Sequence, residues 1–155
     1  MKYHEAEKAV RDLVAAAGAR GRRRLGAAVV ERLTGDDESA EAAEAEFDDD
    51  ARRAFEAARE DPAGSTSAQL REWLERIDEG TLSDGDMDPR LVFALEALDR
   101  WAAYLDDPED VEAVARLAIV SLEEVDYRVS ADLDDFLGTP EMAAEFERIT
   151  ALLRG

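Results

Sequence analysis

Carboxylates dominate the side chains that could do chemistry in this sequence, which has 39 Asp and Glu in 155 residues. Asp84, Asp86 and Asp88 stand at positions 1, 3 and 5 of a calcium-loop pattern. The pattern then fails, because Pro89 stands where the loop needs glycine and Leu95 where it needs a bidentate glutamate. We therefore expect a solvated loop in which Asp88 caps the following helix.

A second acidic group lies near the C-terminal end and has the oxygen ligands that a hard cation such as magnesium prefers. Where acidic residues are this common, such groups also arise by chance, and the other interpretation is a solvated link between two helices. We predict no metal site and no cofactor, and a carboxylate enzyme that depends on a divalent metal stays open as an alternative. The residues are Glu123, Glu124, Asp126, Asp132, Asp134 and Asp135.

The densest negative patch is the third candidate, and it is the one we predict to bind a partner. Opposite charge across an interface mainly speeds association and selects the partner. The competing interpretation is the solvated outer face of an amphipathic helix, which we predict to run over about residues 39–60. The patch consists of Glu41, Glu44, Glu46, Asp48, Asp49 and Asp50.

Several kinds of catalytic site lack their residues. Cysteine is absent and His4 is the only histidine, which excludes thiolate chemistry and leaves too few ligands for a histidine-based zinc or di-iron site. The arginine-rich segment 18–26 has no lysine and hydroxyl after its second glycine, as a P-loop requires. We expect its arginines to pair with carboxylates. The sequence thus predicts a protein that is not an enzyme.

Net charge is −20 and unevenly distributed: residues 1–34 hold eight basic against four acidic side chains, and residues 35–155 hold 11 against 35. Such a field repels nucleic acid and anionic membranes and attracts a basic protein. Acidity as an adaptation to a salty cytoplasm is the alternative. Charged residues at the start and the lack of a long apolar run predict a cytoplasmic protein.

The elements that position these residues are all expected to be helices, because apolar residues recur every three or four positions. A Thr66 capping box and the pairs Asp88-Pro89, Asp107-Pro108 and Thr139-Pro140 mark helix starts. We predict an all-α, single-domain bundle of six or seven helices over residues 1–155. Its central antiparallel pair spans about 89–105 and 108–127, and the aromatic residues Trp73, Trp101 and Tyr104 belong to its core.

Residues 69–77 (Gln-Leu-Arg-Glu-Trp-Leu-Glu-Arg-Ile), the acidic loop 84–88 and the alanine-rich helix after it resemble the bacterial YjaG-type family, which has no assigned function. Residues 24–33 are similar to its early helix. The resemblance implies an all-helical bacterial protein and carries over no functional residues. A weaker likeness links the chain to helical proteins thought to be immunity partners of toxins. The leading hypothesis is thus a non-enzymatic protein that binds a basic protein, such as a toxin.

Overall fold

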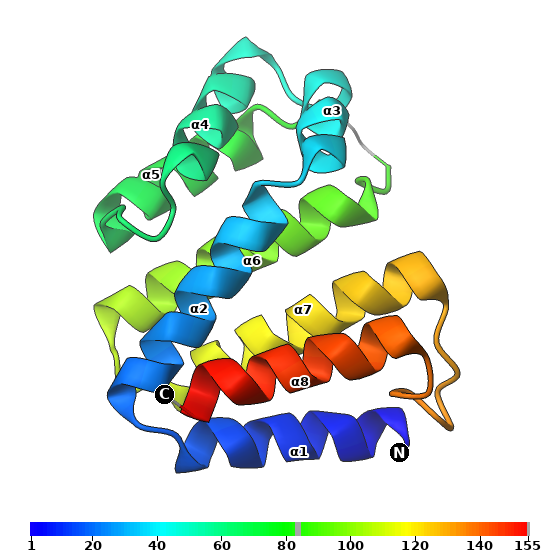
Figure 1. The fold of residues 1–155 in the computed structure, drawn as a ribbon. Coiled ribbons are helices and arrows are strands. Elements are labelled where there is room, and N and C mark those ends of the chain that lie inside the picture. Colours follow the sequence, from blue (N-terminus) through cyan, green and yellow to red (C-terminus); the bar gives the residue numbers. More distant parts are fainter. Residues whose placement is uncertain (83–84, 155) are drawn as a thin grey trace.

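Helices form nearly all of the regular structure in the computed structural model, which describes residues 1–82 and 85–154 (Figure 1). Within these residues there is no strand, and two isolated bridges are the only extended pairings. The predicted all-helical fold is confirmed, but the predicted number of six or seven helices is wrong. The eight helices are α1 (Tyr3–Ala16), α2 (Ala19–Thr34), α3 (Asp37–Glu46), α4 (Asp49–Glu60), α5 (Ser67–Glu79), α6 (Pro89–Asp106), α7 (Val111–Val129) and α8 (Pro140–Arg154).

Two helices join the two groups that make up the molecule. In Figure 1, α2 and α6 lie between a group formed by α3, α4 and α5 and a group formed by α1, α7 and α8. α6 packs against α2, α3, α5 and α7, and α7 packs against α1, α2, α6 and α8. The predicted central pair corresponds to α6 and α7, which pack against each other, while its antiparallel crossing stays a prediction.

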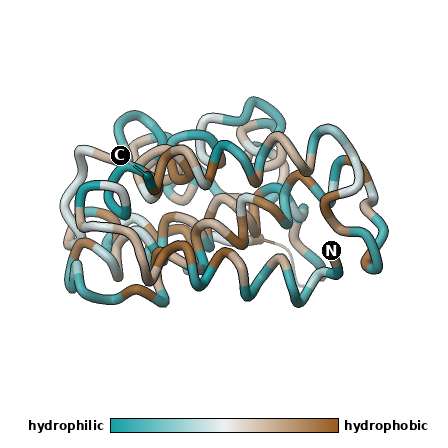
Figure 2. The backbone as a smooth tube through the Cα atoms, turned by 60° about the horizontal axis from the view of Figure 1, so that its bottom comes forward, coloured by the Kyte–Doolittle hydropathy of each residue, from teal (hydrophilic) through white to brown (hydrophobic). Residues whose placement is uncertain are grey.

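The core follows the apolar stripes of the sequence, so that hydrophilic residues alternate with hydrophobic ones along the helical turns in Figure 2. Trp101 is fully buried, donates its indole N–H to the carbonyl of Pro62 at 3.0 Å, and stacks on Tyr104. The prediction that Trp101 and Tyr104 belong to the core is confirmed. Trp73 is partly buried and packs against the edge of this core.

The additional helix arises because the segment predicted as one helix, residues 39–60, is divided at Phe47. Phe47 adopts an extended backbone and is buried, and the next residue, Asp48, caps α4 by accepting the backbone N–H of Ala51 at 2.8 Å. The amide of Asp48 donates to the carbonyl of Gly80 at 2.8 Å. This junction is therefore tied to the end of α5.

Three predicted helix starts are confirmed and one is wrong. Thr66 forms its capping box, Asp88 caps α6, and Thr139 accepts the backbone N–H of Met142 at 3.2 Å. Asp107-Pro108 does not begin a helix, because residues 107–110 make a tight turn. α7 begins one turn later with Asp110 as its cap, accepting the N–H of Ala113 at 3.0 Å.

Two arginines of segment 18–26 bind backbone carbonyls, whereas the sequence predicts that they pair with carboxylates. Arg22 donates to the carbonyls of Val14 and Ala15 at 2.9 Å, and Arg24 donates to the carbonyl of Leu152 at 2.9 Å. These carbonyls lie at the C-terminal ends of α1 and α8, where partial negative charge attracts a cation. The expected pairing of Arg22 and Arg24 with carboxylates is wrong.

Candidate functional site

An open pocket of about 430 Å³ lies where the start of α1, the first half of α6, the last turns of α7 and the loop after α7 meet. Its lining combines apolar and aromatic side chains with carboxylates, a mixture that suits a ligand with an apolar stem and a positive end. We call it the acidic aromatic pocket. Its lining residues are Tyr3, Phe93, Glu123, Asp126, Tyr127 and Leu133.

The loop after α7 is fixed by backbone hydrogen bonds that bring it against α1. Ser130 ends α7 in the left-handed region (φ 53°), and the next amide, of Ala131, donates to Oδ1 of Asp126 at 2.8 Å. The amide of Tyr3 donates to the carbonyl of Leu133 at 2.9 Å. Leu133 therefore keeps its side chain at the edge of the pocket, where it is 63% exposed.

Aromatic rings form the apolar wall. Phe93 on α6 and Tyr127 on α7 meet edge to face with their centroids 6.0 Å apart, and Tyr127 remains 44% exposed. The guanidinium of Arg90 already lies over the Tyr127 ring, 5.8 Å from its centroid, and pairs with Glu38. Tyr127 thus sits in a position where its π-face attracts a cation.

The carboxylates of the pocket keep an excess of negative charge. Burial raises the pKa of Glu123, and Glu96, Glu7 and Asp126 raise it further, against the opposing effect of Arg116. Arg116 lies 2.6 Å from Glu96 and 3.5 Å from Glu123, so one guanidinium is shared between two carboxylates.

The same field acts on the phenol of Tyr3, whose pKa is raised by burial and by the charges of Glu123 and Glu7. A half-buried carboxylate held among like charges costs folding free energy, and such costs concentrate at functional sites. The raised pKa values of Glu123 and Tyr3 therefore mark this pocket as a candidate functional site.

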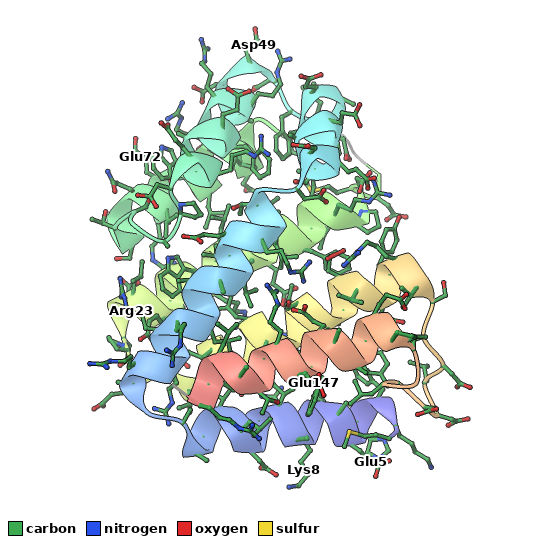
Figure 3. The ribbon with its side chains drawn as sticks, viewed as in Figure 1. Glu5, Lys8, Arg23, Asp49, Glu72 and Glu147 are labelled. Atoms are coloured by element: carbon green, nitrogen blue, oxygen red, sulfur yellow. The ribbon has the colours of Figure 1, made fainter. Side chains whose placement is uncertain are left out.

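The predicted partner surface lies elsewhere, on α3, α4 and the junction between them. Figure 3 shows Asp49 at the opposite end of the molecule from Glu5, which is on the first turn of α1. Asp49 pairs with Arg52, Asp50 pairs with Arg76 at 2.8 Å, and Asp48 serves as a helix cap.

Of the other three residues of that surface, Glu46 accepts the backbone N–H of Asp88 at 3.0 Å, whereas Glu41 and Glu44 are exposed on α3. Asp50 has a lowered pKa because of its hydrogen bond from Arg76. Most of the predicted patch is thus engaged within the fold, and its role in partner binding stays a prediction.

A second pocket, of about 390 Å³, opens beside Arg32 between the end of α2 and the last turns of α7. Arg32 pairs with Glu124, lies 3.7 Å from Glu145, and donates to the hydroxyl of Ser121 at 2.7 Å. Glu124 and Glu145 are nearly fully buried, and the buried Ser121 donates its hydroxyl to Glu145 at 2.5 Å. Because arginine and glutamate side chains neutralise each other's charge in this network, we infer that its role is to stabilise the fold.

The candidate cation ligands do not converge. Glu124 is occupied by arginines, Asp126 by the amide of Ala131, and Asp132 accepts the amide of Asp134 at 2.9 Å. In residues 1–82 and 85–154, no three acidic or histidine side chains come together in a way that could hold a metal ion. Asp84 of the calcium-like loop lies outside the described residues.

Sequence reasoning missed the acidic aromatic pocket because its residues come from four separate segments. Phe93 and Tyr127 fall within the two predicted central helices, and Leu133 falls within the acidic segment interpreted as a solvated link. One signal was present in the sequence: Leu133 is a large apolar residue within the acidic run Asp132-Leu133-Asp134-Asp135. Comparison with known proteins found no matching family model, no similar curated protein and no similar solved structure.

Proposed function

We propose that this protein is a non-enzymatic binding protein that recognises a basic segment of a partner protein. The observation that carries the proposal is the acidic aromatic pocket, where exposed rings and partly buried carboxylates meet on a chain of net charge −20. The charge of the whole chain steers a cationic partner toward the surface, and the pocket gives a defined point of contact.

The composition of the pocket supports binding more than catalysis. Its ionisable groups are two carboxylates and two phenols, those of Tyr3 and Tyr127, with Arg116 behind them, and no hydrogen bond between these lining residues pairs a nucleophile with a base. Rings and carboxylates side by side recognise a cation through its charge and its apolar stem. A cationic toxin is one partner of this kind, in line with the resemblance to immunity proteins.

The proposal is tested by calorimetry with a defined arginine- and lysine-rich peptide at rising sodium chloride. We expect binding at low salt that weakens steadily, because charges at an exposed site are screened. Glu123→Gln should weaken binding, and Glu72→Gln, at an exposed carboxylate on α5, is the matched control for removing one negative charge elsewhere. Absence of binding at low ionic strength, or binding that salt leaves unchanged, would contradict the proposal.

Adaptation to a salty cytoplasm makes a different prediction, which thermal melts can separate. If the acidity serves salt tolerance alone, the protein gains stability steeply up to molar potassium chloride and binds no basic peptide at any salt concentration. If it serves recognition, peptide binding is present and depends on Glu123, which lies in the acidic aromatic pocket.

A further inference from the structure

We propose that the acidic aromatic pocket takes a lysine side chain in preference to an arginine side chain. This inference rests on the proposed function, since it names the chemistry of the group that anchors the basic partner. It follows from which carboxylate oxygens of the pocket remain open and from the shape of the apolar wall.

Each of the two pocket carboxylates has one oxygen that already faces a donor, through a hydrogen bond in Asp126 and through a longer ion pair in Glu123. Oδ1 of Asp126 accepts the amide of Ala131 at 2.8 Å, and Oε1 of Glu123 lies 3.5 Å from the guanidinium of Arg116. In the described part of the chain, the other oxygen of each carboxylate has no hydrogen bond or ion pair. The pocket therefore offers two single acceptor oxygens on separate side chains.

That arrangement suits an ammonium better than a guanidinium. Arginine gains most of its advantage when its planar fork meets both oxygens of one carboxylate. Here one oxygen of Asp126 already accepts a hydrogen bond and one oxygen of Glu123 faces Arg116, so a bidentate contact with arginine is weakened. A lysine ammonium is a compact charge with three rotatable donors, and it can contact single oxygens on two side chains.

The apolar wall fits the four-carbon stem of lysine. Phe93, Tyr127 and Leu133 face the same pocket, whose volume of about 430 Å³ exceeds the space that one extended side chain requires. A lysine stem gains by covering apolar surface while its charged end reaches the acceptors. The exposed ring of Tyr127 adds attraction for the cation.

Carboxylates from α1, α6 and α7 favour a cation at this point, while Arg116 and the guanidinium of Arg90 over the Tyr127 ring oppose it. Glu7 on α1, Glu96 on α6 and Asp126 on α7 all act on Glu123, and Arg116 alone opposes them among the groups that shift its pKa. A bound ammonium replaces like-charge repulsion with attraction. A bound ammonium should therefore favour the ionised form of Glu123, and binding should weaken as the pH falls.

The test uses an acetylated and amidated Ser-Arg-Ser-X-Ser-Arg-Ser peptide in which X is lysine, arginine or glutamine, titrated into the full chain by calorimetry at low salt. The two flanking arginines keep the attraction to the acidic surface constant across the series. We expect the lysine peptide to bind about tenfold more tightly than the glutamine peptide and several-fold more tightly than the arginine peptide.

Two variants and one control link this preference to the pocket. Glu123→Gln and Tyr127→Leu should each remove most of the preference for lysine, and Tyr127 is exposed enough for the change to leave folding intact. Glu72→Gln, which removes an exposed carboxylate on α5 outside both the pocket and the predicted partner surface, should leave it unchanged. Circular dichroism verifies the fold of each variant.

The outcomes separate this inference from the proposed function. Equal binding of all three peptides, or a lysine preference that persists in both pocket variants, would overturn the inference while leaving recognition of a basic partner in place. Tighter binding of the arginine peptide would also overturn it. If no peptide of the series binds, both the inference and the proposed function fail.

Discussion

Replacing Arg32 with methionine tests whether the buried network around it stabilises the fold. The change keeps an unbranched stem of similar length and removes the charge and every donor. Arg32 pairs with Glu124, lies near Glu145 and donates to the side chain and the carbonyl of Ser121. Methionine leaves the two glutamates buried with fewer counter-charges, which is the costly situation for an ionised carboxylate.

The expected cost follows from what remains after the change. Removing one partner of a buried ion pair costs about 3–5 kcal/mol. Here Arg128 still donates to Glu124 at 2.6 Å and Arg148 to Glu145 at 3.0 Å, and Arg32 itself is about one quarter exposed. We therefore expect a loss of about 2–3 kcal/mol, which lowers the melting temperature by roughly 5–10 °C in a domain of this size.

The matched control is Arg11→Met, which removes an exposed pair with Glu112 and should cost less than about 1 kcal/mol. Thermal unfolding followed by circular dichroism measures both variants against the parent. If the two substitutions lower the melting temperature equally, the reasoning about burial is refuted.

The same comparison has a defined pH dependence. Burial alone would raise the pKa of Glu124, but hydrogen bonds from Arg128 and Arg32 outweigh it and leave the pKa below the ordinary value of 4.5. A lowered folded-state pKa gives stability that is fully present above the unfolded value and lost as the pH falls through the folded value. The gap between parent and Arg32→Met should therefore shrink when melts are repeated below pH 4.5.

Three further substitutions have expected outcomes in unfolding experiments. Glu123→Gln should leave stability unchanged or raise it at neutral pH, because its raised folded-state pKa means that the charged form is disfavoured in the fold; marked destabilisation would contradict this. Gly26→Ala should cost about 1–3 kcal/mol, since the added Cβ would lie 2.6 Å from the Trp101 ring, while Gly18→Ala, with open space around it, should cost far less. Thr66→Ala, which removes the cap of α5, should cost about 1 kcal/mol, and denaturant unfolding with an unchanged midpoint would contradict that expectation.

Most of the fold could be predicted from the sequence because its signals are local. Apolar stripes and caps such as Thr66 and Asp88 act within a few residues, and both caps form as expected. The break at Phe47 was missed, although Asp48 followed by two more aspartates is a typical start of a helix. The alanine-rich flanks favoured a continuous helix and hid that signal.

The candidate site could not be predicted in the same way. Tyr3, Phe93, Glu123 and Leu133 are far apart in the sequence, and only the packing of α1, α6 and α7 brings them to one pocket. Local charge density pointed to the run around Asp48 instead. A high density of acidic residues in the sequence does not show which of them become helix caps or ion-pair partners. Tertiary contacts determine which carboxylates remain available to a partner.

The most direct measurement is a map of amide and aromatic chemical-shift changes in the isotope-labelled protein, titrated with the lysine peptide at low salt. We predict that the largest changes occur at Tyr3, Phe93, Tyr127 and Leu133, around the acidic aromatic pocket. Changes centred on α3 and α4, with the pocket residues unaffected, would contradict the account.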